Sequence, residues 1–234
     1  LASSAASDVY KRQVDIGKLA GKPVVAVITS MAQPLGTHIG NALEVKDAID
    51  VLAGRTQGDL LEISLLLGSH MLVLAEKAKT LPEARAMLEN ALSSGAGLRK
   101  LAEMIAAQGG DPRVVEDLSL LPQAAVKRVM RAETAGYLSA MDTTALGMAA
   151  QRMGAGRAKK SDMLDYSVGY VLHVRLGDEV TEDTPLATLY ARNEAEAEEA
   201  EKAIRKALTI AGEKPSVPPL WDAVVTAEGI IYNR

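Results

Sequence analysis

The sequence predicts an α/β protein in two parts. A short β-branched run, Pro23–Thr29, is followed by several stretches with helical periodicity. The pattern changes near Pro122, after which short β-rich runs dominate. The chain has 234 residues, which is enough to bury a substantial core. We therefore expect a buried parallel strand with helices over residues 14–124, and a β-rich α+β, barrel-sandwich-like C-terminal domain over residues 125–234.

The first thirteen residues are small and polar. Residues Ser3–Gln13 resemble the in-frame translation of a transposase adapter used in preparing sequencing libraries, and a disordered tail is the alternative. The segment lacks the leading charge and the apolar stretch of a secretory signal. We expect residues 1–13 to be non-native and the native sequence to start near Val14.

The α/β part begins with the strand at Pro23–Thr29, whose apolar β-branched residues are typical of a strand buried in a parallel sheet. A polar loop over residues 30–40 follows. Asn41 is then expected to cap a helix, with Glu44 in the capping-box position, and Gly54 to end it.

Three further helices are expected in the α/β part. Residues 59–79 are apolar nearly all round the first turns, which is typical of a helix buried in a core. Thr80 and Glu83 form a second capping box, which opens a helix to about Leu92. The third helix runs from about residue 97 to 107.

The C-terminal part alternates short strands with two helices. One helix is expected over about 143–153 and another over 193–211, where acidic residues precede basic ones and so suit the helix dipole. Gly177–Asp178 is a hairpin-type turn signal between two of the strands. The expected β-rich runs are 127–132, 136–141, 168–175 and 185–191.

Composition limits the partners. One Trp, six Tyr and no Phe leave no aromatic platform for single-stranded nucleic acid, and a net charge of −4 gives no basic footprint. No Cys is present, so no disulfide or thiolate zinc site can form. No apolar run reaches the length of a membrane span. We expect no nucleic-acid partner, no membrane partner and a cytoplasmic location.

Motifs for chemistry are sparse. No glycine-rich phosphate loop is found. The stretch Gly154–Arg157 is either an anion site or, more often for such a pattern, a helix C-terminus. His38, His70 and His173 do not stand at metal-ligand spacing. We interpret His70 as a satisfied core or pocket histidine and His173 as a residue on the face of a strand.

The segment over residues 168–191 resembles the half-motif of lipoyl and biotinyl carrier domains. A carrier needs a lysine at a hairpin tip, and neither candidate hairpin, 136–141 or 176–185, contains one. A non-catalytic barrel-sandwich binding module therefore stays open as an alternative function.

Three longer stretches, 29–50, 106–124 and 132–180, together resemble the C-terminal half of pyrimidine-nucleoside phosphorylases, close relatives of thymidine phosphorylases. The most specific piece is QPLGTHIGNALEVKDAID at residues 33–50. The similarity covers about Val14–Leu208. It implies a pentosyltransferase of nucleoside salvage, which uses phosphate to split a pyrimidine nucleoside into free base and pentose 1-phosphate. A related phosphorylase of nucleoside monophosphates is a nearer alternative.

The resemblance also implies that this chain is a C-terminal fragment with an incomplete α/β domain. The family's phosphate loop and base-binding residues precede it, so no catalytic or substrate-binding residue is carried over and the fragment is expected to be inactive alone. The full-length enzyme is expected to be a homodimer.

One family feature falls within the chain, a potassium site. Matching positions place in it the backbone carbonyls of Leu35 and His38 and the side chain of Asp47. The family usually has Ala in place of His38 and Glu in place of Asp47. Oxygen ligands suit a hard cation. The alternative is that Asp47 is a solvated helix residue.

Overall fold

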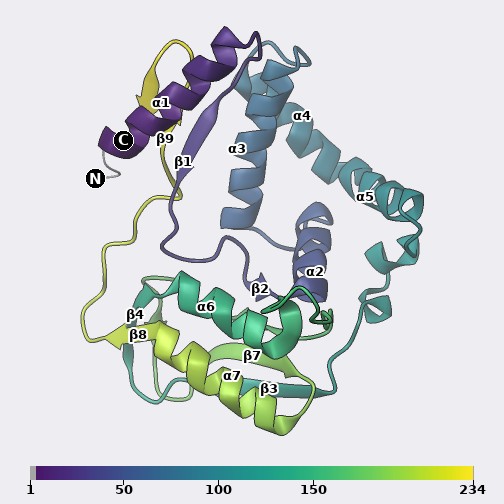
Figure 1. The fold of residues 1–234 in the computed structure, drawn as a ribbon, viewed down its shortest axis with the longest axis vertical. Helices are drawn as coiled ribbons and strands as arrows, with labels where there is room; N and C mark the ends of the chain where they lie inside the picture. Colours follow the sequence, from purple (N-terminus) through teal and green to yellow (C-terminus); the bar gives the residue numbers. More distant parts are fainter. Residues whose placement is uncertain (1–3, 234) are drawn as a thin grey trace. The chain divides into compact units, whose positions relative to one another are not determined.

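The structure is a computed structural model that describes residues 4–233, and its helices and antiparallel sheets confirm the α/β class (Figure 1). The chain divides into two compact units that interleave along the sequence. Within the described residues, the first unit comprises 4–31, 57–94 and 218–233, and the second comprises 32–56 and 95–217. The expected domain boundary between residues 124 and 125 stays a prediction.

A helix and a three-stranded sheet begin the first unit. The strand order is β1-β9-β10, and both pairings are antiparallel. Val14 on the helix is buried against Ile28, Ala223 and Val225 of the sheet, so this face holds the helix in place. The elements are α1 (Ser4–Leu19), β1 (Ala26–Thr29), β9 (Trp221–Val225) and β10 (Ile230–Tyr232).

The expectation of a parallel strand at Pro23–Thr29 was wrong. β1 pairs antiparallel with β9, with Val27 opposite Val224. Of its four residues only Ile28 is buried. A β-branched run indicates that a strand has apolar surroundings, but it does not indicate whether the neighbouring strand is parallel or antiparallel.

Helices α3 (Asp59–Leu74) and α4 (Leu81–Ser93) complete the first unit and pack against each other. The Thr80 side chain accepts the backbone N–H of Glu83, which confirms the predicted cap. The expected full burial of α3 was wrong, because Leu67 is 43% and Met71 68% exposed. Its apolar residues surround the helix, and α4 covers only one side.

The second unit has two small sheets with helices beside them. The strand orders are β2-β5-β7-β3 and β6-β4-β8, and neither sheet closes into a barrel within the described residues. The strands are β2 (His38–Ile39), β3 (Val126–Arg131), β4 (Gly136–Met141), β5 (Gly169–Leu172), β6 (Glu179–Val180), β7 (Pro185–Ala191) and β8 (Leu208–Ala211). The helices are α2 (Asn41–Leu52), α5 (Ala96–Ala107), α6 (Thr143–Ala150) and α7 (Glu194–Ala207), with short turns η1 (Pro112–Val115), η2 (Leu118–Leu120) and η3 (Gln151–Ala155).

Most core residues of the second unit lie between its sheets and the adjacent helices α6 and α7 (Figure 1). Tyr170 on β5 is fully buried, and its hydroxyl donates a hydrogen bond to the carbonyl of Leu146 on α6. Burial raises the pKa of Tyr170. A buried hydroxyl needs such a partner, so this bond fixes α6 against the sheet.

Of two local expectations in this unit, one was wrong and one was confirmed. The final helix ends at Ala207 rather than residue 211, because the next four residues form β8 and pair with β4. The chain reversal expected at Gly177–Asp178 was confirmed, because the two predicted β-rich runs on either side of it, which contain β5 and β7, pair antiparallel with each other. The short strand β6, which lies between them and pairs with β4, was not predicted.

A close backbone approach joins β2 to β5. Gly40 and Gly169 both have positive φ angles, of 136° and 146°. A Cβ atom on Gly169 would lie 2.1 Å from the carbonyl oxygen of Ile39, and one on Gly40 would lie 2.4 Å from that of Val168. Backbone atoms cannot yield as a flexible side chain does, so these two positions require glycine.

We predict that Gly169→Ala destabilises the protein by more than about 2 kcal/mol, because it combines a strained φ with a clash against backbone. The matched control is Gly147→Ala on α6, where an added Cβ meets nothing within 4 Å. That control is expected to raise stability by up to about 1 kcal/mol, since alanine favours helix. Urea unfolding of both variants measures the difference, and equal stabilities would contradict the packing described.

Candidate functional site

The candidate site lies where the loop before β2 meets α2. Asp47 stands in the second turn of α2 and is only 3% exposed. Its Oδ2 accepts the backbone N–H of Thr37 at 3.2 Å, and its Oδ1 lies 3.5 Å from Nδ1 of His38. The burial excludes the alternative that Asp47 is a solvated helix residue. The structure thus brings Asp47 to the 37–38 end of the loop.

Among the described residues, the side chains and backbone groups that contact Asp47 include no Lys or Arg. Burial lowers the pKa of His38, and the pull of Asp47 in the opposite direction does not overcome it. The imidazole is therefore mostly neutral at pH 7, and its Nδ1 also lies 3.0 Å from the Thr37 hydroxyl. Among the described residues, Asp47 has one N–H donor and one neutral ring as partners.

The nearby cations are engaged by a different carboxylate, Asp50. Lys46 Nζ lies 2.5 Å and Arg55 Nε 2.7 Å from its oxygens. Burial acts to raise the pKa of Asp50, but the hydrogen bonds from Lys46 and Arg55 outweigh it and lower the pKa overall. The negative charge of Asp50 is thus neutralised by two side chains of the protein. Among the described residues, the charge of Asp47 has no such partner.

The Asp47 carboxylate is the kind of oxygen ligand that a hard cation needs. A buried carboxylate is costly unless it is paired with a cation or coordinates one. Within residues 4–233, no cluster of three or more His, Asp or Glu residues suited to a metal occurs, so a site of the transition-metal type is not found there. The ligand roles expected for Leu35, His38 and Asp47 stay predictions.

Asn41 does not cap α2, which corrects the sequence-based expectation. The N-cap is Gly40, whose N–H donates to the Glu44 carboxylate, so only that half of the capping box forms. The Asn41 amide instead donates to the carbonyl of Ala155 at 2.9 Å. The close approach of Gly40 to Val168 and Gly169 moves the helix start by one residue. Asn41 then ties α2 to the end of η3.

Residues 154–157 and His173 have structural roles, whereas His70 differs from its expected role. Gly154 has φ 108° inside η3, which favours the interpretation of residues 154–157 as a helix C-terminus. His173 Nε2 lies 2.7 Å from the Thr188 hydroxyl. The expectation that His70 is satisfied was wrong, because its buried Nε2 has no hydrogen-bond partner among residues 4–233.

Comparisons with known proteins agree with this architecture. A family model described as the α/β domain of a glycosyl transferase family matches residues 4–98. A second, described as the pyrimidine nucleoside phosphorylase C-terminal domain, matches residues 137–211. The pyrimidine-nucleoside phosphorylase of Bacillus subtilis is 48% identical over 189 residues, which cover 81% of this chain and 44% of that protein. The chain belongs to the pyrimidine-nucleoside phosphorylase family.

Other family members give the same result. The pyrimidine-nucleoside phosphorylase of Geobacillus stearothermophilus is 48% identical over 81% of this chain and 44% of its own length. That of Staphylococcus aureus strain USA300 is 42% identical over 213 residues, 91% of this chain and 49% of its own length. The chain therefore spans about half the length of the curated phosphorylases it matches. One family model begins at residue 4, and the non-native origin expected for residues 1–13 stays a prediction.

We predict that acid weakens the fold through its histidines. Burial lowers the pKa of His70, so the folded state binds the proton less readily than the unfolded chain, whose histidines titrate near pH 6.5. The free energy of unfolding should then rise with pH up to about 6.5 and level off above, because the unfolded state binds more protons below that pH.

His70→Leu should reduce that slope, by at most about 1.4 kcal/mol per pH unit. The exposed Glu103→Gln, whose carboxylate pairs with Lys100, is the control and should leave the slope unchanged. Urea unfolding at several pH values measures both. A His70→Leu slope equal to that of the unmodified chain would refute a titrating role for His70.

Proposed function

We propose that this chain forms part of a pyrimidine-nucleoside phosphorylase, a pentosyltransferase of nucleoside salvage and pyrimidine metabolism. The 48% identity to the Bacillus subtilis enzyme over 81% of the chain is the observation that carries this proposal. The substrates would be a pyrimidine nucleoside and phosphate, and the products a free base and a pentose 1-phosphate. We infer a cytoplasmic location, because salvage draws on nucleosides inside the cell.

The reaction places an anion beside a sugar that becomes oxocarbenium-like, while charge develops on the departing base. Positioned cations and hydrogen-bond donors stabilise these developing charges and hold the phosphate against the sugar. By family resemblance, those groups belong to the part of the relatives that this chain does not match. This chain would position the loop at residues 35–38, which Asp47 anchors through the Thr37 N–H.

We further propose that this loop and Asp47 hold a potassium ion. The carbonyls of Leu35 and His38 and the Asp47 carboxylate would be its ligands, and the bound cation would supply positive charge behind the phosphate site. Support comes from the burial of Asp47 and from the lack of a fully charged partner for it within the part of the chain that the structure describes. A potassium ion would balance that carboxylate where the protein itself does not.

A homodimer is the assembly that the family resemblance favours. Its main contact surface would lie in the helical domain of the full-length enzyme rather than in these residues. Within residues 4–233, no helix has both the length and the apolar character needed to cross a membrane.

We predict that the purified chain releases no base from uridine or thymidine, whereas a chimera is active. The chimera joins the N-terminal half of the Bacillus subtilis enzyme to this chain in place of that enzyme's own C-terminal half. Phosphate-dependent release of uracil or thymine is the measurement. The same N-terminal half alone is the control and should be inactive. Activity of the isolated chain, or an inactive chimera that is well folded, would contradict the proposal.

We predict that potassium stabilises the chain through Asp47. At a potassium concentration ten times the Kd, linkage gives about 1.4 kcal/mol, or roughly 3–6 °C in Tm for a chain of this size. The comparison is made against choline chloride at equal ionic strength. Asp47→Asn should abolish the difference, whereas Asp47→Glu, the usual family residue, should keep it.

The matched control for that measurement is Asp111→Asn. Asp111 is an acidic residue on another loop, where it pairs with Arg113. Its potassium effect should equal that of the unmodified chain. A potassium effect that survives in Asp47→Asn would contradict the proposed ligand set.

A further inference from the structure

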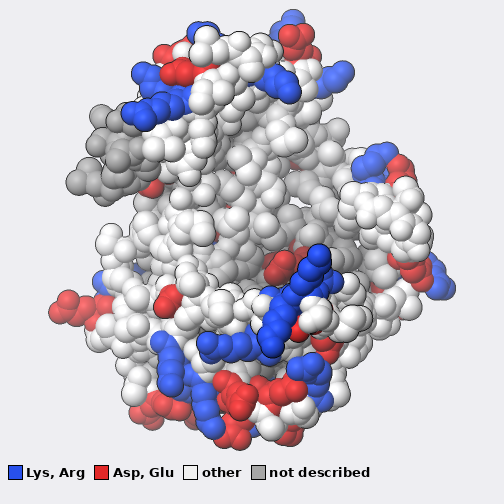
Figure 2. Space-filling model, viewed as in Figure 1, with Lys and Arg blue, Asp and Glu red and all other residues white. Residues whose placement is uncertain are grey.

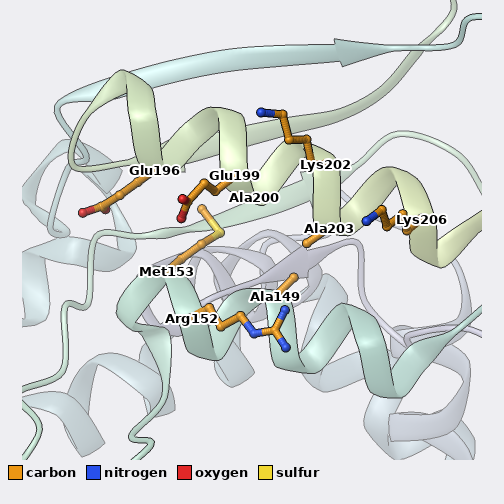
Figure 3. A pocket seen from close by; sticks show the side chains of 9 residues that line it. All are labelled: Ala149, Arg152, Met153, Glu196, Glu199, Ala200, Lys202, Ala203 and Lys206. Carbon is orange, nitrogen blue, oxygen red and sulfur yellow. The ribbon is translucent and has the colours of Figure 1, made fainter.

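A hollow lies between α7 and the segment formed by α6 and η3, apart from the Asp47 loop (Figure 3). Its volume is about 330 Å³, at the lower end of the range of roughly 300–1,000 Å³ for small-molecule pockets. Its floor is apolar and buried, with Ala149 2%, Met153 3% and Ala200 5% exposed. Charged side chains of both signs cover this face of α6 and α7 (Figure 2).

Two of the charged residues at the rim form hydrogen-bonded ion pairs with residues outside the hollow. Glu196 accepts a hydrogen bond from Arg192 at 2.8 Å. Lys202 donates to Glu198 at 2.6 Å, and its ammonium points away from the hollow (Figure 3). These pairs lie four residues apart on or beside α7 and stabilise the helix itself.

Three other charged residues at the rim do not form pairs that stabilise the helix. Arg152 on η3 and Lys206 on α7 make no hydrogen bond or ion pair within the described residues, and neither does Glu199. The guanidinium of Arg152 and the ammonium of Lys206 lie at the same end of the hollow and point toward each other, and Glu199 lies at the other end (Figure 3). The helix dipole favours a cation near the α7 C-terminus, but it does not explain a second cation brought there from η3.

We propose that this hollow binds a small phosphomonoester that also carries hydroxyl groups. The planar guanidinium of Arg152 and the ammonium of Lys206 together suit phosphate oxygens. The Glu199 carboxylate would accept hydrogen bonds from hydroxyls at the other end. The apolar floor would pack against the carbon skeleton of the ligand.

Pentose phosphates are the class of ligand that fits both ends. This choice rests on the proposed function, because phosphorolysis produces a pentose phosphate. The hollow would then be a second site for a product-like ligand, built only from residues of the second unit.

The test uses the whole chain with methionine methyl groups labelled with carbon-13. Ribose 5-phosphate, inorganic phosphate and ribose are titrated separately at constant ionic strength. The Met153 methyl should shift saturably with ribose 5-phosphate, about tenfold more weakly with inorganic phosphate, and not with ribose. The methyl of Met148, which is 44% exposed on α6 and does not line the hollow, should not shift.

Three substitutions separate a specific site from general attraction of anions. Arg152→Gln and Lys206→Gln should each weaken binding of ribose 5-phosphate about tenfold. Lys202→Gln is the matched control, since it removes the same charge from the same helix, and it should change affinity less than twofold.

An absent or unsaturable Met153 shift would overturn the proposal, as would equal weakening by Lys202→Gln and Lys206→Gln. A Met153 shift that follows protein concentration without ligand would also overturn it, because a second copy of the chain would then occupy the hollow. The methyl shifts measure binding directly and do not require catalytic activity. Specific binding of ribose 5-phosphate together with an inactive chimera would support the binding site and contradict the proposed phosphorylase function. An active chimera without specific binding would support the phosphorylase function and contradict the binding site.

Discussion

The second unit depends on one steric constraint, the contact between the backbones at Gly40 and Gly169. Any side chain at either position would meet a carbonyl oxygen of the opposite segment. Because both are glycine, the two residues of β2 can pair with β5 and become the edge of a four-stranded sheet. The chain then turns directly into α2, which places Asp47 against the loop it has just left. The geometry of the candidate site is therefore a consequence of backbone packing.

The candidate site contains two buried carboxylates whose charges are compensated differently. Asp50 and Asp47 stand three residues apart on α2, and both are buried. Asp50 is paired with two cations, so it strengthens the helix and the turn that follows. Asp47 has a neutral imidazole and a backbone amide instead. A buried carboxylate left in that state is expensive, which is why a bound cation is the simplest account of its presence there.

Sequence patterns predicted local structure better than long-range pairing. The start of α4 followed from Thr80 and Glu83, because a cap depends on neighbours within one turn. The direction of β1 and the role of Asn41 were missed, because each depends on a residue more than 40 positions away. The pairing of Thr37 and His38 with Asp47 had no sequence signal of its own. The expected ligands came from family resemblance, since backbone carbonyls leave no residue-type pattern.

The central claim is that the loop before α2 and Asp47 form a cation site in a phosphorylase fold. Anomalous diffraction from crystals of the chain grown in thallium(I) tests it most directly, because thallium(I) is a heavy substitute for potassium. The account predicts an anomalous peak within bonding distance of the Leu35 and His38 carbonyl oxygens and the Asp47 carboxylate. A map with no peak at this loop, and with Asp47 bonded only to the Thr37 N–H and His38, would contradict it.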